Sequence, residues 1–370
     1  MSVRRLRPLA APVAEAAQRL KRLEANVALL DRVRPVNLTA ELTRLTRAFE
    51  SGQLAEPAFE YAPPVQLGPV RRELVDLAAA LDPDDLEQRL LAERARELEL
   101  EASLAERVGA ADFAVVAERR FPLSETPDDA RRLAERFLTA PQQVEPQAEA
   151  EKLHVSDDTR DAASLWSQLS RRLSAERFAV RLEIVVGLVS LAAVADGVVR
   201  VRAGARLSAK VGERISLHEV EGHVRPRVTG PALGGVFVAG TARASEDEEG
   251  RAILLEERAG LLDAERRHEL GRRYLAAESL RRGATFWDTV TLLGQRGATL
   301  AGAIELAARV HRGGGLGREL IYLQGYCRVA VAFAQRPALE RVLASGRVSI
   351  SAALSLLAGS IELDDDRNVV

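Results

Sequence analysis

Apolar residues recur at helical spacing through the first 140 residues of the chain. Over residues 9–52, leucines alternate with arginines in this pattern, and Pro35 interrupts it, which predicts helices on either side of that proline. Residues 66–140 continue the pattern, and Asp84 and Asp85 precede an apolar helical run, so one of them is a candidate N-cap. The pattern therefore predicts an N-terminal helical region over residues 1–140.

The composition changes in residues 141–161. This stretch is rich in Gln, Glu, Asp and Pro and has few large apolar residues, which is typical of segments that cannot form a core of their own. We therefore predict a linker or exposed loop here, followed by a second domain over residues 162–370.

Strand patterns appear only after this segment. Residues 178–186 alternate and then become apolar, and residues 189–194 form a second candidate strand. The dipeptide Asp196-Gly197 is typical of a hairpin turn and precedes a third candidate strand at 198–202. These residues predict a small antiparallel sheet.

Helices are expected again from about Ser208 onward. The first of them should contain His218, and residues 250–359 should be helical with a glycine-rich break at 313–317. We therefore expect an α+β fold in which helices predominate and the sheet lies beside the helix of His218. The strand at 198–202 could be an edge that pairs with the backbone of an extended peptide. A purely structural strand is at least as plausible, because every open sheet has edges.

The segment from His218 to His223 carries the most specific chemistry in the chain. It places Glu219 directly after the first of two histidines, an arrangement one residue longer than the H-E-x-x-H zinc motif. On an α-helix, positions i and i+5 lie about 140° apart, so both imidazoles could bind one ion only across a π-bulge or a local break. Gly222 lowers the cost of such a distortion. The alternative is two unrelated surface histidines on a polar helix.

An acidic run follows at residues 245–249 and begins an apolar helix. Acidic residues suit a helix N-terminus, so a charged first turn would explain this run by itself. Beside two histidines, however, a carboxylate becomes a candidate third ligand, because a catalytic zinc takes three protein groups and one water. His268 is a competing ligand, but it lies in a polar run and is expected to be solvated.

Several segments together resemble one family of metallopeptidases. They are the H-E-x-x-x-H segment, the E-E-G-x-A segment at residues 248–252, the run Arg312-Gly313-Gly314-Gly315, and the run Leu320-Ile321-Tyr322-Leu323-Gln324-Gly325. The family includes bacterial proteins described as flavohaemoglobin expression-modulating QEGLA-motif proteins and the microtubule-associated tyrosine carboxypeptidases of animals. The likeness is collinear over about residues 175–335.

The resemblance implies a zincin-like metallopeptidase domain and a function. Zinc would bind His218, His223 and Glu249, with Glu248 as the alternative third ligand, and Glu219 would act as general base on a water held by the zinc. The reaction implied is removal of a C-terminal residue from a peptide or protein, with tyrosine as the candidate residue that the resemblance suggests. The closer likeness to the bacterial branch argues against tubulin as the natural substrate.

One position departs from the family pattern. Arg251 stands where the family favours leucine. The position holds no predicted ligand, so the departure bears on substrate preference rather than on zinc.

A carboxypeptidase also needs a cation for the terminal carboxylate of its substrate. The run at 313–317 lacks the Lys-Ser/Thr ending of a P-loop, which argues against nucleotide binding, and a plain helix connection would explain it. It could instead form a backbone nest that, with Arg309 or Arg312, binds the carboxylate.

Other side chains are candidates for supporting roles. Tyr322, Tyr326 or His311 could hydrogen-bond the oxyanion, although aromatic residues in an apolar helix more often belong to the core. Glu256 lies seven residues after Glu249, on about the same helix face, and could orient a ligand histidine.

Composition agrees with a globular enzyme. A net charge of −2 argues against a dedicated nucleic-acid binder. The sequence has neither a signal-peptide pattern nor an apolar run of membrane-spanning length, which predicts a cytoplasmic protein without a membrane partner. Cys327 is the single cysteine, so it excludes an intrachain disulfide, and it is expected to be a small buried hydrophobe.

Two classes of function remain after the sequence alone. The first is a zinc peptidase, for which the motif does not separate exopeptidase from endopeptidase action. The second is a zinc-binding regulatory or interaction protein on the same scaffold whose catalysis has decayed. The free carboxylate of Glu219 favours the first, because a structural site has no use for it.

Overall fold

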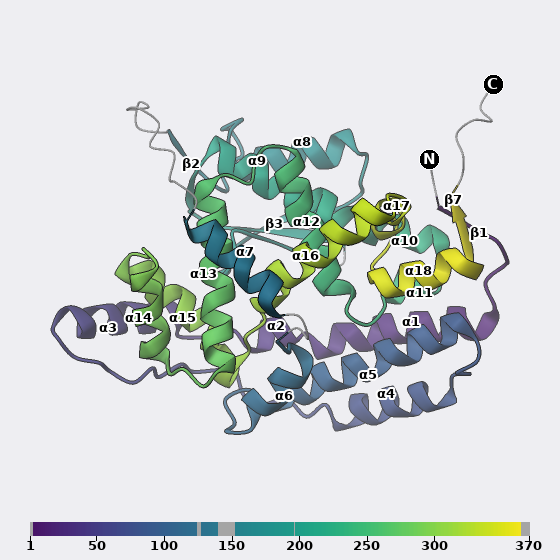
Figure 1. Cartoon of the computed structure of the whole chain (residues 1–370), viewed down its shortest axis with the longest axis horizontal. Coiled ribbons are helices and arrows are strands. Elements are labelled where there is room, and N and C mark those ends of the chain that lie inside the picture. The colour runs from purple at the N-terminus through teal and green to yellow at the C-terminus, as the bar shows by residue number, and fades with distance from the viewer. Residues whose placement is uncertain (1–2, 124–126, 140–151, 196, 364–370) are drawn as a thin grey trace.

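The computed structural model of the chain describes residues 3–123, 127–139, 152–195 and 197–363. The predicted α+β fold with predominating helices is confirmed (Figure 1). Three small sheets accompany the helices in the described part of the chain. None of the described helices has the combination of length and apolar character needed to cross a membrane.

Apart from strand β1 (Val3–Arg5), the regular elements of the N-terminal region are helices, as predicted. They are α1 (Ala11–Val27), α2 (Leu29–Arg32), α3 (Leu38–Glu50), α4 (Gly68–Ala80), α5 (Leu86–Glu106), α6 (Phe113–Arg120) and α7 (Pro127–Thr139). Helices α1, α4 and α5 pack on one another along one side of the molecule (Figure 1). The side chain of Asp85 accepts a hydrogen bond from the backbone N–H of Gln88 at 2.9 Å, which confirms the predicted N-cap.

The principal sheet is mixed rather than purely antiparallel. Its order is β3 (Arg181–Val185), β5 (Val198–Arg202), β4 (Ala192–Ala195), with β4–β5 antiparallel and β3–β5 parallel. The register pairs Ala195 with Val198, as the predicted hairpin requires, while Asp196 of the predicted turn lies outside the described residues. Because β5 is the central strand, the prediction that 198–202 forms an edge is wrong. Strand β4 is an edge, and it is the strand that contacts the helix segment of His218.

The other two sheets each consist of two antiparallel strands. Strand β1 (Val3–Arg5) pairs with β7 (Ile361–Leu363), and β2 (Leu153–Val155) pairs with β6 (Arg206–Ser208). Most of the predicted linker at 141–161 lies outside the described residues. Its last part contains β2, so that part is strand rather than loop.

The C-terminal half is a series of helices around the candidate site. They are α8 (Leu165–Ala175), α9 (Ala209–Leu217), the π-helix η1 (His218–Val224), α10 (Arg225–Leu233), α11 (Val236–Ala239), α12 (Ala244–Arg258), α13 (Ala264–Arg281), α14 (Phe286–Gln295), α15 (Leu300–Gly315), α16 (Leu320–Gln335), α17 (Ala338–Ala344) and α18 (Ile350–Gly359). Helix α9 begins as predicted, because the Ser208 hydroxyl accepts from the N–H of Val211 at 3.3 Å. The predicted break falls inside α15, where Arg312, Gly313 and Gly314 leave the helical conformation.

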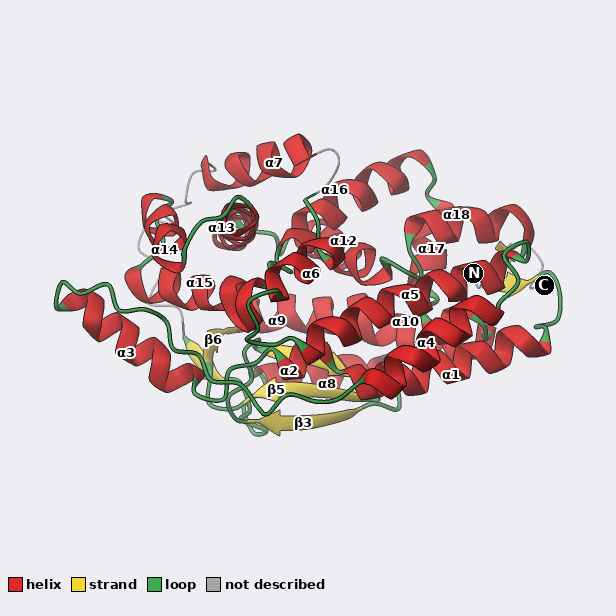
Figure 2. Ribbon diagram, turned by 90° about the horizontal axis from the view of Figure 1, so that it is seen from below, coloured by secondary structure: helices red, strands yellow, loops and turns green. Residues whose placement is uncertain are grey.

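Two apolar cores hold these elements together. The larger one draws on α1, α4–α7 and α11–α18, so it crosses from the N-terminal region into the C-terminal half. The smaller one contains the sheet, α8 and α9, together with Val220 and Val224 of η1. Figure 2 shows β3 and β5 on one side of the molecule, opposite most of the helices. Segment η1 therefore lies with one face on the smaller core and another against α12.

Helices α12 and α16 cross where neither has a side chain. A Cβ built on Gly250 would lie 2.2 Å from the carbonyl carbon of Gly325. One built on Gly325 would lie 2.0 Å from the carbonyl oxygen of Glu246. Such distances are far below van der Waals contact, so both glycines are needed for this approach. The crossing fixes the position of the acidic run in α12.

Candidate metal and anion site

The two histidines of the H-E-x-x-x-H segment lie at the two ends of a single π-helical turn. Residues 218–224 form η1, in which the N–H of Arg225 bonds to the carbonyl of Val220, five residues earlier. This confirms the predicted π-distortion. The wider turn places His218 and His223 on one side, with 3.3 Å between their Nε2 atoms and 5.1 Å between ring centroids.

Glu249 completes a three-residue group with these histidines. Its Oε2 lies 3.4 Å from Nε2 of His218 and 3.7 Å from Nε2 of His223. The candidate ligand atoms of the three residues all lie within 4.8 Å of one another. Among the residues that the structure describes, Oε2 of Glu249 is a buried oxygen with no hydrogen-bond partner. A buried carboxylate oxygen without a donor is costly, and a cation between the three atoms would satisfy it.

The outer nitrogens of both rings are held by other carboxylates. Nδ1 of His218 lies 2.6 Å from Oε1 of Glu256, and Nδ1 of His223 lies 3.0 Å from Oε1 of Glu248. A carboxylate on Nδ1 keeps the proton there and leaves the Nε2 lone pair for a metal. Glu256 is thus placed as expected for orienting a ligand. Glu248 contacts the outer face of His223, whereas Glu249 faces the Nε2 atoms.

Arginines compensate these buried carboxylates. Nε of Arg266 donates to Glu256 at 2.9 Å, and Arg227 donates to Glu248. Burial raises the pKa of each carboxyl, but the cations outweigh it, so the pKa of Glu248 and that of Glu256 both fall to about 2. Both groups are therefore carboxylates at neutral pH.

The same charges act on the histidines. Burial disfavours an imidazolium at His223, but Glu248 and Glu249 outweigh burial and raise its pKa to about 10. The pKa of His218 is also raised: burial lowers it, but the neighbouring carboxylates of Glu249 and Glu256 outweigh burial. In the absence of a cation the site therefore binds protons, which is the behaviour of a site built for positive charge.

Glu219 differs from the other acids around the site. It is half-buried on η1 next to His218, and within the described ranges it forms no hydrogen bond or ion pair. The acids of α12 around it all have cationic partners. The side-chain oxygens of Glu219 are therefore not engaged by another described residue.

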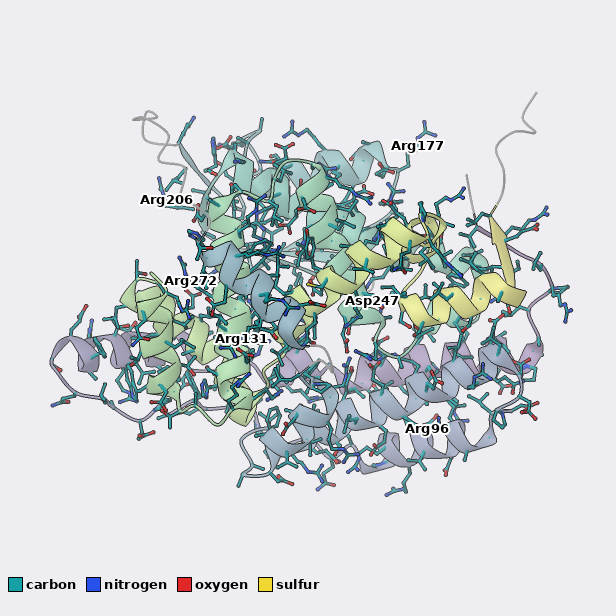
Figure 3. The ribbon with its side chains drawn as sticks, in the orientation of Figure 1. Arg96, Arg131, Arg177, Arg206, Asp247 and Arg272 are labelled. Atoms are coloured by element: carbon teal, nitrogen blue, oxygen red, sulfur yellow. The ribbon has the colours of Figure 1, made fainter. Side chains whose placement is uncertain are left out.

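The acidic run is not a solvated first turn. Glu246, Asp247, Glu248 and Glu249 are all buried, although they lie near the start of α12. Arg328 donates to Asp247 at 2.7 Å, and the N–H of Ile350 donates to it at 2.8 Å. Figure 3 shows Asp247 within the molecule, whereas Arg177 and Arg206 reach outward. Glu246 and Asp247 do lie in the first turn of α12, as the helix-dipole explanation expects, but their burial and ion pairs show that this explanation is incomplete.

The predicted anion-binding residues gather around Glu319. Nε of Arg309 donates to Oε1 of Glu319 at 2.8 Å, and Nη2 of Arg312 lies 3.6 Å from the same oxygen. Arg309 also donates to the hydroxyl of Tyr322 at 3.4 Å. These three predicted residues therefore form one cluster.

Arg318, which was not predicted from the sequence as a site residue, joins this cluster to the three-residue group of His218, His223 and Glu249. Its Nη1 donates to the Tyr322 hydroxyl at 3.2 Å and its Nη2 donates to Oε1 of Glu249 at 3.1 Å. Arg318 directly follows the glycine run, so a third arginine beside Arg309 and Arg312 was the available signal.

The cluster holds more positive than negative charge. The guanidiniums of Arg309, Arg312 and Arg318 lie near the single carboxylate of Glu319, and Arg318 is shared with Glu249. Arg312 is buried, and Arg309 and Arg318 are half-buried. Burial, reinforced by the two neighbouring arginines, lowers the pKa of Arg312 to about 10 despite Glu319. Nε of Arg312 is buried without a hydrogen-bond partner in the described part of the chain. The cluster can therefore accept an anion.

Other candidates lie elsewhere. Nε2 of His311 lies 2.9 Å from the Thr289 hydroxyl, and the Tyr326 hydroxyl donates to Glu257 at 2.7 Å. Both side chains are therefore engaged away from the two ligand histidines. His268 is buried, contrary to the expectation of a solvated side chain, and lies outside the three-residue group. The backbone N–H of Gly313 donates to the Tyr61 hydroxyl at 2.7 Å. That bond argues against an open backbone nest at the glycine run.

Comparison with known proteins shows the family of the chain. The family model of the microtubule-associated tyrosine carboxypeptidases matches residues 46–363, and the chain belongs to this family. A comparison with curated proteins gave no match. The resemblance of the sequence motifs is thus confirmed, over a longer stretch than the motifs themselves span. The family is one of carboxypeptidases.

Proposed function

We propose that this protein is a zinc-dependent carboxypeptidase that removes one residue from the C-terminus of a peptide or protein. The observation that carries the proposal is the convergence of two Nε2 atoms and the unpartnered Oε2 of Glu249. Both imidazoles are turned toward that point by carboxylates on their Nδ1 atoms. Two histidines and one carboxylate are a common catalytic ligand set for zinc, and they leave a position for water.

The chemistry that zinc supplies when bound is a lower pKa for a bound water, about 7, and polarisation of the scissile carbonyl. Glu219 would take the proton of the attacking water and return it to the leaving amine. This assignment is supported by its half-buried position beside His218 and its lack of a cationic partner among the described residues.

The arginine cluster supports action at a chain end rather than within a chain. A terminal carboxylate placed against Arg312 would satisfy its unpartnered Nε and the excess charge of the cluster. Arg318 contacts both Tyr322 and Glu249, so such a carboxylate would lie near the metal ligands. Because the Tyr322 oxygen accepts from two guanidiniums, its own hydrogen remains to donate to substrate.

The peptide backbone would pair with β4. This strand is an edge of its sheet and contacts η1, whereas β5 is enclosed between two strands. An extended substrate along β4 would lie beside η1, which carries the histidines.

Metal analysis and peptide hydrolysis test the proposal. Protein purified without added metal should contain about one zinc per chain, and His223→Ala should contain none. Glu219→Gln should retain zinc but hydrolyse a peptide at least about 100-fold more slowly. Undiminished hydrolysis by Glu219→Gln would refute its role as general base.

Substrate end groups separate the remaining alternatives. A peptide with a free C-terminal carboxylate should be cleaved, whereas the same peptide as its C-terminal amide should not. Cleavage of both would indicate an endopeptidase. Zinc binding without cleavage of any peptide would indicate a zinc-binding protein whose catalysis has decayed. A series that varies only the last residue, with tyrosine included, would define the residue removed.

A further inference from the structure

The π-helix that carries the metal ligands lacks one backbone donor. In π-spacing, the N–H of residue 226 would reach the carbonyl of Glu221, and in α-spacing it would reach that of Gly222. Residue 226 is proline and has no N–H. The preceding donor, the N–H of Arg225, is already used by the carbonyl of Val220. The carbonyl of Glu221, or in α-spacing that of Gly222, therefore loses its expected donor.

A side chain from another helix fills this place. Nη1 of Arg251, on α12, lies 2.8 Å from the carbonyl oxygen of Glu221 and 3.3 Å from that of Gly222. Arg251 is buried, with 4% of its surface exposed. Burying a guanidinium is costly unless its donors are used. These two bonds use Nη1, whereas Nε of Arg251 is buried without a hydrogen-bond partner among the described residues.

The surrounding packing leaves little freedom for other arrangements. A Cβ on Gly222 would lie 2.6 Å from Cβ of Ala252, the residue after Arg251. Segment η1 and helix α12 are thus in direct contact at the point where Arg251 reaches across. The same helix α12 carries Glu249 two residues earlier.

We propose that Arg251 is a positioning residue of the metal site, whose guanidinium replaces the N–H missing at Pro226. By bonding the carbonyls of Glu221 and Gly222, it holds the π-turn in the form that aims His223 at Glu249. The proposal rests on the metal site of the proposed function. It also gives a role to the position where the family pattern favours leucine: Arg251 acts on the ligand helix rather than on substrate preference.

The proposal predicts that residues 226 and 251 are coupled. Zinc affinity would be measured by competition with a chromophoric chelator for the full-length wild type, Arg251→Leu, Pro226→Ala and the double variant. Arg251→Leu should weaken zinc binding about 10–100-fold, as is typical for partners of metal ligands. In the Pro226→Ala background, where an N–H is available, the same substitution should cost no more than about 3-fold.

Two further variants guard against trivial effects. Arg251→Lys keeps a donor near the carbonyls and should lose less affinity than Arg251→Leu. Arg258→Leu removes an exposed arginine of the same helix, which is paired with Glu340, and should leave zinc affinity unchanged. If Arg251→Leu alone does not fold, the comparison of Arg251→Lys in the two backgrounds replaces it.

The outcomes separate this proposal from the proposed function. Equal losses in both backgrounds, or no loss in either, would overturn the role of Arg251. A wild-type protein that binds no zinc would overturn the metal site itself. In that case the unfolding temperatures of the four metal-free proteins test whether Arg251 replaces the N–H missing at Pro226. A smaller effect of Arg251→Leu in the Pro226→Ala background would support this replacement, and equal effects in the two backgrounds would overturn it.

Discussion

Replacing Gly222 with alanine tests whether the spacing between η1 and α12 sets the geometry of the metal site. The new Cβ would lie 2.6 Å from Cβ of Ala252. Carbon atoms in contact prefer about 3.5–4.0 Å, so the two helices must separate locally by about 1 Å. Metal–ligand distances tolerate only about 0.2 Å. His223 follows Gly222 directly, and Glu249 precedes Ala252 by three residues, so the separation acts on both ligands.

The effects on stability and on zinc should differ in size. Overpacking costs about 1–3 kcal/mol, while alanine gains about 1 kcal/mol over glycine within a helix. The net loss of about 0–2 kcal/mol should lower the unfolding temperature of a 370-residue chain by no more than about 3 °C. Zinc affinity, by contrast, should fall more than about 100-fold, because a ligand itself is displaced.

Chelator competition and thermal unfolding would measure these two quantities, and a reciprocal substitution provides the control. Ala252→Gly removes the atom that clashes, so the double variant Gly222→Ala/Ala252→Gly should recover zinc affinity to within about 5-fold of wild type. Gly294→Ala is the matched control: Gly294 is an exposed helical glycine with open space around its Cβ position, and its substitution should leave zinc binding unchanged. Wild-type zinc affinity in Gly222→Ala, or a double variant no better than the single one, would refute the reasoning.

Three further predictions follow from the same geometry. Glu249→Gln should lose zinc almost completely in chelator competition. Glu248→Gln changes a partner of His223 and leaves the predicted ligands in place, so it should weaken zinc binding about 10–100-fold. Equal losses in the two variants would show that the two carboxylates do not have different roles. The pKa of His223 is raised to about 10 in the metal-free site, so zinc must displace a proton to bind, and zinc affinity should rise with pH between 6 and 9. Calorimetry in buffers of different ionisation enthalpy at pH 7.5 should detect release of about one to two protons on zinc binding. No proton release would contradict the raised pKa. Gly325→Ala should lower stability by more than about 3 kcal/mol in denaturant unfolding, since its Cβ would lie 2.0 Å from the carbonyl oxygen of Glu246, and an unchanged midpoint would show that the helix crossing is looser than described.

The starts of two helices and the π-turn at His218–Val224 could be predicted from the sequence because they depend on residues close together in the chain. The N-caps at Asp85 and Ser208 follow from the side chains that accept backbone N–H bonds. The π-turn follows from the five-residue separation of His218 and His223 combined with the need for one face. Each of these inferences requires only residues within a few positions of one another.

Features that depend on distant partners were not accessible in this way. Strand β5 was one candidate for a substrate-pairing edge, but it is central because β3 joins it in parallel, and no local pattern specifies that pairing. The acidic run of α12 has the composition of a solvated first turn, yet it is buried because Arg328 and the N–H of Ile350 come from the C-terminal helices to bond Asp247. Arg318 was missed for the same reason, since its importance lies in its contact with Glu249, 69 residues away.

The choice between Glu248 and Glu249 as third ligand depends on contacts between distant residues, so the sequence alone could not make it. Adjacent residues on a helix point about 100° apart, so only one of them can face the Nε2 atoms, but the sequence does not fix the rotation of α12. The glycine crossing does fix it: Gly250 must meet the backbone of Gly325, and Ala252 must meet Gly222. With those two contacts made, Glu249 faces the Nε2 atoms and Glu248 reaches only Nδ1 of His223. The small residues of the E-E-G-x-A segment thus determine which glutamate can serve as a ligand, although neither touches the metal group itself.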